Sequence, residues 1–316
     1  AYLGRWPFCA KQRYFKEDPM TESRPFQRSP ASTDGGPVAA SLLVPTRNGA
    51  AALAEFLPSF ATQTIGHAYE VIIVDNGSTD GSAEIPRRLG IETHLFGTNL
   101  GFCGAYNRAF REVVRDENFV LLSNPDLFVP PETIGRLVAA AGSDPKIGFV
   151  GPVQRHMDTH AIRSAGVYWA CGHLPRNVLR PGDPLSTLEA AFLLVRREIL
   201  GQVGALDEAF FINFEDVDWQ FRAHRLRYRS VLAADAEIYH RPPTTPRVST
   251  GAYYTTRNGC MITARYCSQA ALRRLQFRLR AEGIAGRLLA RPRGRFILEG
   301  LQDFRRGVTG KKVWQE

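Results

Sequence analysis

The sequence lacks the long apolar segment that a membrane-spanning helix needs. Its 316 residues contain no uninterrupted apolar run of roughly 18 residues. The polar, proline-rich stretch 1–37 also lacks the apolar region of a signal peptide. The five cysteines include neither a CxxC pair nor the spacing of a zinc site. These absences argue against a spanning anchor, a zinc domain and a secreted protein, and they favour a cytoplasmic setting with reduced cysteines.

Acidic residues are scarce in the C-terminal segment. Between Leu272 and Lys312, twelve Arg and Lys residues stand against three acidic ones, an excess that equals the net charge of +9 of the whole chain. Leu, Ile and Phe are interleaved with these basic residues, a pattern that suits an anionic membrane surface. Nucleic acid is the other electrostatic partner, and a solvated helical face is the ordinary alternative. We predict a basic helical extension over 268–316 that contacts the inner face of the cytoplasmic membrane and does not bind nucleic acid.

Short apolar runs alternate with polar turns and helical stretches between residues 38 and 126. Runs at 40–44 and 70–74 are each followed by turn residues and a helical stretch, and the alternation continues through 91–96, 101–115 and 119–122. Repeated strand–turn–helix units predict a parallel sheet with right-handed crossovers. Ligands bind such sheets beyond the carboxyl ends of the strands, where these polar turns lie.

Beyond residue 126 strands and helices alternate less regularly. We expect strands at 147–153, 189–195, 228–233 and 237–239, helices at 216–225 and 255–266, and a loop between the first two strands. The predicted class is α/β. The predicted divisions are a flexible lead (1–37), a main domain (38–267) with a nucleotide-binding half (38–126) and an acceptor-binding, catalytic half (127–267), and the helical extension (268–316).

Three carboxylates crowd into four residues at Glu215, Asp216 and Asp218, between Phe214 and Trp219. Like charges this close repel one another, and carboxylates beside aromatic surface lose solvation. A metal, a cationic substrate group or a catalytic role would offset both costs. The ordinary alternative is a helix start, because Asn213 is a good N-cap and acids in a first turn complement the helix dipole. Alone, the cluster leaves both interpretations open.

Asp75 closes an apolar strand and opens the turn 76–81. A carboxylate at this place can accept from a base imide N–H or from a ribose hydroxyl, and an Asx turn is the alternative. A calcium loop is excluded, because its sixth position requires glycine and here holds Asp80. The segment 99–104 brings glycines to a helix start, which suits a phosphate or ribose, although the GxGxxG fingerprint is absent.

Two further strand ends carry metal-ligand chemistry. The turn Asn124-Pro125-Asp126 follows the strand 119–122, and Asp126 there could hold a divalent cation that neutralises a diphosphate. An ordinary turn is the alternative. His240 follows the strand 237–239; a single histidine at a strand end is more often structural, but neutral imidazole is a good ligand for Mn²⁺ beside carboxylates.

Taken in order, these segments resemble the family 2 glycosyltransferases of GT-A fold, specifically the bacterial rhamnosyltransferase- and galactofuranosyltransferase-like branch. The resemblance extends over roughly residues 40–267. The matching segments are 71–82, 99–102, 124–126, 192–197, 204–211, 215–219 and His240. The resemblance implies a Rossmann-like, mostly parallel central sheet flanked by helices.

The resemblance also implies a role for each matching residue. Asp75 corresponds to the carboxylate that reads nucleobase and ribose, and Asp216 to the general base, which Glu215 supports. Asn124 replaces the first acid of the metal-binding DxD motif. The donor nucleotide would then be lined by Asp75, Asn99, Arg47 and Asn124, the cation (Mn²⁺ or Mg²⁺) held by Asp126 and His240, and the acceptor touched by Asp218 and Trp219. The turn 44–48 departs from the family, which more often has an aromatic residue before Asn48.

The implied activity is inverting, metal-dependent transfer of a rhamnose-like or galactofuranose-like sugar. The donor would be dTDP- or UDP-linked, and the acceptor a cell-surface glycan or a lipid-linked glycan. One alternative is a catalytically silent GT-A scaffold that binds glycan or membrane. Another is a sugar-1-phosphate nucleotidyltransferase, which would need a glycine-rich pyrophosphate loop; Gly49 is a poor substitute, and the acid cluster would have no role.

Overall fold

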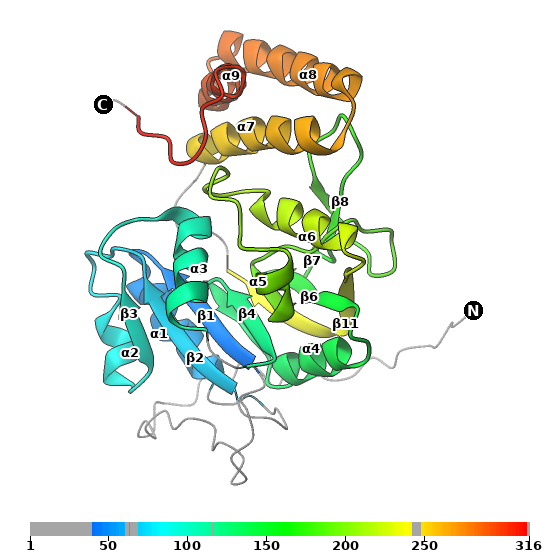
Figure 1. The fold of residues 1–316 in the computed structure, drawn as a ribbon. Coiled ribbons are helices and arrows are strands. Elements are labelled where there is room, and N and C mark those ends of the chain that lie inside the picture. Colours follow the sequence, from blue (N-terminus) through cyan, green and yellow to red (C-terminus); the bar gives the residue numbers. More distant parts are fainter. Residues whose placement is uncertain (1–39, 61–62, 64–68, 115–116, 242–247, 315–316) are drawn as a thin grey trace.

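The computed structural model describes residues 40–60, 63, 69–114, 117–241 and 248–314, and the predicted lead at 1–37 lies outside them. A nine-stranded mixed sheet has the order β3-β2-β1-β4-β10-β6-β11-β5, with β7 paired to β6 (Figure 1). Strands β3, β2, β1 and β4 are parallel, whereas β10 is antiparallel to both of its neighbours. Their bounds are β1 (Ala40–Thr46), β2 (Tyr69–Asp75), β3 (Glu92–Leu95), β4 (Phe119–Ser123), β5 (Leu127–Phe128), β6 (Ile147–His156), β7 (Ile162–Ser164), β10 (Phe192–Arg196) and β11 (Arg229–His240).

Helices cover both faces of this sheet, which explains why its strands are apolar on both sides. Leu42 and Val44 of β1 join the core beneath one set of helices, and Leu43 joins the core beneath the other. The first set is α1 (Ala50–Phe56), η1 (Leu57–Phe60) and α4 (Thr133–Gly142). The second is α3 (Gly101–Glu112), α5 (Glu198–Gln202) and α6 (Glu215–Arg225). Helix α2 (Glu84–Arg88) precedes β3.

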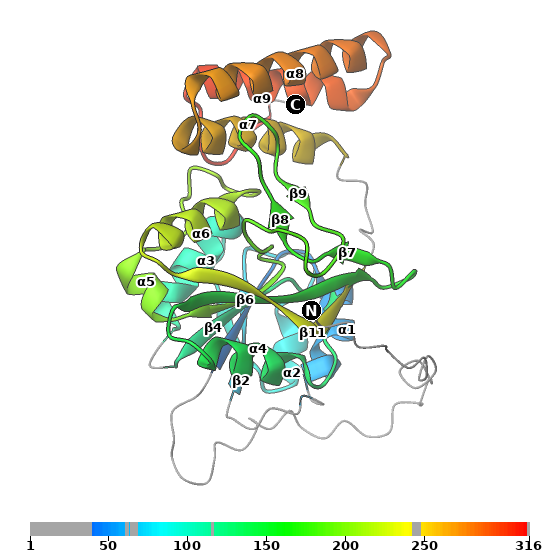
Figure 2. The same ribbon diagram turned by 90° about the vertical axis from the view of Figure 1, so that its right-hand side faces the viewer.

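Three C-terminal helices form a separate layer at one end of the molecule (Figures 1 and 2). They are α7 (Val248–Tyr266), α8 (Gln269–Leu288) and α9 (Pro292–Arg305). Cys260 of α7, Leu275 of α8 and Ile297 of α9 share one small apolar core. Gly294 brings the backbones of α8 and α9 together, since a Cβ there would lie 2.5 Å from the amide nitrogen of Arg287. Among the described residues, none of the helices combines the length and the apolar content that a membrane span requires.

A hairpin of β8 (Val167–Tyr168) and β9 (Arg176–Asn177) extends from the sheet toward the helical layer (Figure 2). Its tip carries Cys171, which forms a disulfide with Cys267 between α7 and α8. The expectation that the cysteines are all reduced is therefore wrong for this pair. The two lie 96 positions apart, so no local spacing could signal the bond. Cys103 and Cys260 are free and buried.

The predicted α/β class and the expected strands and helices are confirmed, with three corrections in detail. The stretch between residues 153 and 189 contains β7, β8 and β9 rather than loop alone. The two strands expected at 228–239 are one strand, β11, whose register shifts between Ala233 and Glu237. The third correction concerns the start of α6, where Phe214 rather than Asn213 is the N-cap.

Candidate active site

Asp75 stands at the carboxyl end of β2, opposite Thr46 of β1. Its side chain is buried, and its Oδ1 accepts hydrogen bonds from the amides of Gly77 (3.1 Å) and Ser78 (2.9 Å). The Asx turn is therefore present. Its Oδ2 is also buried and has no hydrogen-bond partner among the described residues. A buried acceptor without a partner is costly, so this oxygen is suited to an N–H or O–H donor from a ligand.

Asn76 links the Asp75 turn to the start of α3. Its Nδ2 donates to the carbonyl of Gly101 (3.0 Å), and its Oδ1 accepts from the amide of Leu100 (2.9 Å). Asn99 closes the same segment, because its Oδ1 accepts from the amide of Gly101 (3.0 Å). Sequence reasoning missed Asn76, although its position directly after the carboxylate at the strand end could have indicated a role at this edge of the sheet.

The turn after β1 is tied to the turn after β2. The amide of Asn48 donates to Ser78 Oγ (3.0 Å), and Asn48 Oδ1 accepts from the amide of Thr79 (2.9 Å). The side chain of Arg47 is exposed beside these contacts. Arg47, Asp75 and Asn99 are therefore brought to one edge of the sheet, as their strand-end positions predict.

Asp126 and His240 are brought together by backbone pairing between β5 and β11. Leu127 pairs with His240, and the amide of Arg241 donates to the carbonyl of Asp126 (3.0 Å). Asp126 Oδ2 and His240 Nδ1 are 3.8 Å apart, which is too long for a hydrogen bond. His240 Nδ1 lies 3.1 Å from the carbonyl of Arg241; donation to that oxygen leaves Nε2 with the lone pair.

These two side chains suit a cation that takes its remaining ligands from a bound molecule. Among the described residues, no group of three or more His, Cys, Asp or Glu side chains could hold a metal alone. Mg²⁺ typically uses one or two protein carboxylates together with substrate phosphates. One carboxylate and one imidazole at the ligand-binding edge of the sheet fit that arrangement, provided that a diphosphate is present.

A strained loop precedes the acid cluster. Phe211, Asn213 and Phe214 have φ angles of 64°, 71° and 70°, in the left-handed region that bulky residues avoid. Asn213 is not the N-cap of α6: Phe214 occupies that position without a capping side chain, and Asn213 Nδ2 donates to Thr255 Oγ1 (3.3 Å). The N-cap interpretation of Asn213 is therefore wrong. Each such residue costs on the order of 1–3 kcal/mol, so surrounding contacts must hold the loop.

Two adjacent buried residues of α7 hold this loop. Asn258 Nδ2 donates to the carbonyls of Phe210 (3.0 Å), Ile212 (2.7 Å) and Asn213 (2.9 Å). Arg257 Nη2 donates to the carbonyls of Ala209 (3.2 Å) and Phe210 (3.0 Å), and both side chains are fully buried. Sequence reasoning missed both residues, because their partners lie some 45 positions earlier in the chain.

The loop also closes against α3. The carbonyl of Phe211 accepts from the amide of Phe102 (3.1 Å). Gly101 has φ +75°, and a Cβ there would lie 2.3 Å from the Phe211 ring. Only glycine tolerates this approach, so the helix start that follows Asn99 is in direct contact with the loop that precedes Glu215.

Asp216 is connected to the Asn124–Asp126 turn through hydrogen bonds to two adjacent residues. Asp216 Oδ2 accepts from the amide of Ala190 (2.9 Å), and the carbonyl of Ala191 accepts from the amide of Asn124 (2.9 Å). Burial raises the pKa of Asp216 to about 6. Burial, and then the charge of Asp216, raise the pKa of Glu215 well above its usual range, and Glu215 Oε2 has no partner among the described residues.

Asp218 and Trp219 correct the predicted acceptor contacts. Asp218 is fully buried, and its carboxylate accepts from Arg222 (2.9 Å), Arg265 (2.7 Å) and Tyr266 (2.7 Å). Trp219 is fully buried and donates through Nε1 to the carbonyl of Gly204 (2.7 Å). Residues two positions apart on a helix face nearly opposite sides, so Asp216 and Asp218 cannot serve one surface. The buried side chains of Asp218 and Trp219 instead stabilise the packing of α6 against its neighbours.

Comparison with known proteins identifies the family. The sequence model described as "Glycosyl transferase family 2" matches residues 41–204. This chain belongs to glycosyl transferase family 2. The chain is similar to the N-acetylglucosaminyl-diphospho-decaprenol L-rhamnosyltransferase of Mycobacterium tuberculosis, to which it is 33% identical over 219 residues, 60% of this chain and 71% of that protein. The undecaprenyl-phosphate 4-deoxy-4-formamido-L-arabinose transferase of Shewanella sediminis is 34% identical over 131 residues, 39% of this chain and 38% of that protein.

Solved glycosyltransferases share the fold. The mannosyltransferase PcManGT from Pyrobaculum calidifontis, in complex with GDP-Man and Mn²⁺, has a TM-score of 0.56 at 17% identity and covers 85% of this chain and 88% of its own. TarS 1-349 of S. aureus, in complex with UDP-GlcNAc, has a TM-score of 0.57 at 19% identity and covers 86% and 82%. The chain is a family 2 glycosyltransferase of GT-A fold.

Proposed function

We propose that this enzyme is an inverting, metal-dependent transferase for a rhamnose-like sugar, with a galactofuranose-like sugar as the next candidate. The observation that carries the proposal is the connection between Asp216, which bonds to Ala190, and the Asn124–Asp126 turn, which bonds to Ala191. Adjacent residues thus bond the proposed base, Asp216, and the first residue of the turn that carries Asp126. The similarity to an L-rhamnosyltransferase supports the choice of sugar.

The donor is proposed to be a dTDP- or UDP-linked sugar. Both nucleobases present an imide N–H, and the unpartnered Oδ2 of Asp75 is a carboxylate acceptor for such a donor. Arg47, Asn99 and Asn124 complete the proposed nucleotide pocket at the same edge of the sheet. Arg47 is exposed there and suits a phosphate.

Asp216 is the proposed general base. An acceptor hydroxyl has a pKa far above neutrality, so a carboxylate must take its proton as the new bond forms. With a pKa of about 6, Asp216 is ionised at neutral pH yet basic enough for that task. The acceptor oxygen bonds to the anomeric carbon, the bond from that carbon to the nucleoside diphosphate breaks, and in-line displacement inverts the centre. Burial and the neighbouring carboxylate raise the pKa of Glu215 well above its usual range, which favours its neutral form and leaves the negative charge on Asp216.

Asp126 and His240 are the proposed protein ligands of a divalent cation, Mn²⁺ or Mg²⁺. When bound with the diphosphate, the cation would supply charge stabilisation to the departing nucleoside diphosphate. The use of a divalent cation is supported by the carboxylate of Asp126 and the imidazole of His240, and by the Mn²⁺ in solved structures of the same fold.

The acceptor is proposed to be a lipid-linked or cell-surface glycan in cell-wall polysaccharide biosynthesis. The name of the mycobacterial relative specifies a sugar on a diphosphate-linked polyprenol, which supports this class. A lipid-linked acceptor would put the enzyme at the inner face of the cytoplasmic membrane, with the basic C-terminal helices as the contact.

The test is thermal-shift binding of a nucleotide-sugar panel (dTDP-rhamnose, UDP-galactofuranose, UDP-GlcNAc, UDP-glucose and GDP-mannose) with and without Mn²⁺. Wild type is compared with Asp126→Ala and with Asp158→Ala, an exposed acid that serves as the matched control. We expect one donor to stabilise wild type and the control in a metal-dependent way, and Asp126→Ala to lose that response.

Transfer to a polyprenyl-diphosphate sugar is then measured with the donor so identified. Failure of a well-folded protein to respond to any donor or free nucleotide would refute the proposal in favour of a silent scaffold. Formation of a nucleotide sugar from sugar 1-phosphate and a nucleoside triphosphate would instead support the nucleotidyltransferase.

A further inference from the structure

We infer that one face of α8 is a docking surface for an anionic lipid bilayer. The face consists of Phe277, Ala281, Ile284 and Leu288, hereafter the α8 stripe. These residues are spaced four, three and four apart, which puts their side chains on one side of the helix. Phe277, Ile284 and Leu288 are 75%, 45% and 81% exposed. Three large apolar side chains in a row on one exposed helix face are unusual for a surface that only water contacts.

The stripe is separate from the face with which α8 packs. Leu272, Leu275 and Leu279 are buried in the core shared with α7 and α9. In both ribbon views α8 is the outermost part of the helical layer, on the side away from the sheet (Figures 1 and 2). The described part of the chain therefore leaves the stripe uncovered, and an external partner is needed to bury it.

Arginines flank the stripe on both sides. At 100° per residue, Arg274 lies on one flank, and Arg273, Arg280 and Arg287 lie on the other. The one acidic residue of α8, Glu282, lies away from the stripe and pairs with Arg293 (3.3 Å). Long basic side chains beside an apolar stripe can extend to lipid headgroups while the stripe enters the acyl region.

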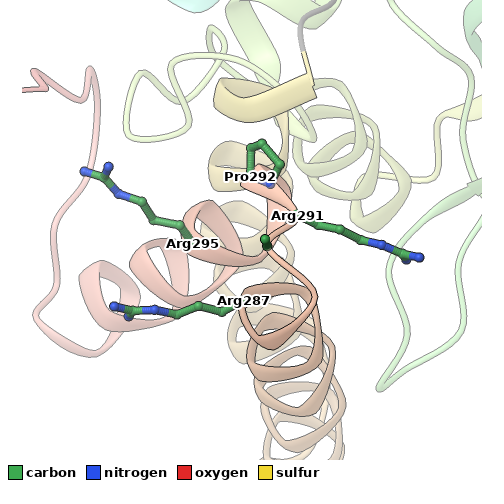
Figure 3. A pocket seen from close by; sticks show the side chains of 5 residues that line it. Arg287, Arg291, Pro292 and Arg295 are labelled. Atoms are coloured by element: carbon green, nitrogen blue, oxygen red, sulfur yellow. The ribbon is translucent and has the colours of Figure 1, made fainter.

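The arginine flank continues around the turn into α9. A cavity of about 420 Å³ there is lined by Arg287, Ala290, Arg291, Pro292 and Arg295. Figure 3 shows Arg287 and Arg295 extending to one side and Arg291 to the other, so their charges spread along the surface rather than converge on one small anion. None of the three arginines makes an ion pair within the described residues. Spread charge matches a lipid surface better than a single phosphate.

The positive charge of the flanking arginines distinguishes between the possible partners of the α8 stripe. A second copy of this chain would bring arginines against arginines, which costs free energy. Nucleic acid would engage the arginines and leave the apolar residues in water. An anionic bilayer satisfies both features. The inference does not depend on the catalytic roles proposed above.

The experiment is co-sedimentation of the full chain with vesicles of phosphatidylcholine, with and without phosphatidylglycerol. Point substitutions are preferable to deletion of the helices, because Gly310 contacts both Ala209 and Arg257 near the acid cluster. The main variant is Phe277→Glu with Leu288→Glu. Leu226→Glu is the control, since Leu226 is also an exposed leucine (46%) but lies beyond the end of α6, outside the α8 stripe. Arg280→Gln with Arg287→Gln tests the charge.

We expect wild type to bind anionic vesicles, with a partition coefficient that falls about tenfold or more in the main variant and several-fold in the arginine variant. Leu226→Glu should bind like wild type. Equal binding of neutral vesicles, unchanged binding by the main variant, or no vesicle binding by wild type would each overturn the inference. A dimer that the main variant abolishes, without vesicle binding, would assign the stripe to a second copy. Vesicle binding is measured without donor or acceptor, so its outcome is independent of transfer activity.

Discussion

The proposed donor side of the site and its acid side are held in place by different kinds of contact. On the donor side Asp75 accepts from amides two and three positions later in the chain, and Asn76 bridges to residues about 25 positions on. On the acid side the loop 209–214 depends on Arg257 and Asn258, in a helix of another layer. The donor side is thus a local turn at a strand end. The acid side is a strained loop stabilised by tertiary contacts.

The difference implies that the two sides can be disrupted separately. The C-terminal layer is part of the acid side, because Gly310 donates to Ala209 (2.7 Å) and accepts from Arg257 (2.7 Å). Substitutions in α7 should therefore lower kcat before they weaken donor binding. Substitutions in the Asp75 turn should weaken donor binding before they lower kcat.

The largest expected effect separates the two carboxylates of the acid side. Asp216→Asn should lower kcat by about 10²- to 10⁴-fold, because the amide cannot take the acceptor proton. Glu215→Gln should cost much less, since the raised pKa of Glu215 favours the neutral acid, which an amide resembles. Steady-state kinetics with saturating donor check both. Equal losses in the two variants would contradict the assignment of the base.

The next effect tests the support of the strained loop. Asn258→Ala removes the donor to three loop carbonyls, so the loop should shift and kcat should fall about 10- to 100-fold, as small misplacements of a catalytic group do. The Kd of the donor should stay unchanged. Thr263→Ala is the control, because Thr263 is buried in the same helix and its hydroxyl donates within that helix, to the carbonyl of Gly259 (2.7 Å). Parallel loss of kcat and donor binding would indicate general destabilisation instead.

The same contrast explains what the sequence could and could not predict. Asp75, Asp126 and His240 were predictable because each follows an apolar strand, and strand ends meet at one edge of a parallel sheet. Arg257 and Asn258 were not, because nothing near them in the chain requires an amide or a guanidinium. Trp219 and Asp218 were misassigned because composition cannot tell which face of a helix is buried. The disulfide escaped prediction for a similar reason: its cysteines meet only after the hairpin has packed against α7.

The third prediction concerns pH. If Asp216 must be ionised, log kcat should rise with a slope of about one up to pH of about 6 and then level off. The raised pKa has a second consequence, since the fold favours the protonated acid. Its contribution to the free energy of unfolding is complete below the ordinary pKa of 3.8 and is lost as pH rises through about 6. Wild type should therefore lose up to about 3 kcal/mol relative to Asp216→Asn between pH 4 and pH 7. Denaturant unfolding of both proteins measures this loss, and an unchanged difference between pH 4 and pH 7 would contradict the raised pKa of Asp216.

A smaller effect is expected on the donor side. Asp75→Asn keeps an oxygen for the amides of Gly77 and Ser78 but replaces the unpartnered oxygen with a donor. Binding of dTDP or UDP should weaken about tenfold, the cost of losing one hydrogen bond to a charged group. Calorimetric titration measures the Kd, and Glu84→Gln, an equal charge change on the exposed side of α2, should leave it unchanged. If Asp75→Asn instead lowered kcat at saturating donor and left the Kd of the nucleotide unchanged, Asp75 would belong to the catalytic side rather than to the donor side.

The smallest effect on turnover should come from the disulfide. Cys171→Ser with Cys267→Ser opens a loop of 96 residues, and chain-entropy arguments assign such a loop about 4–5 kcal/mol of stability. Tm should therefore fall, and reduction of wild type should reproduce the fall. Turnover at low temperature should stay close to wild type, because the hydrogen bonds of Arg257 and Asn258 to the acid loop do not involve either cysteine. A turnover defect as large as that of Asn258→Ala, in protein that is still folded, would mean that the hairpin itself holds the acid side in place.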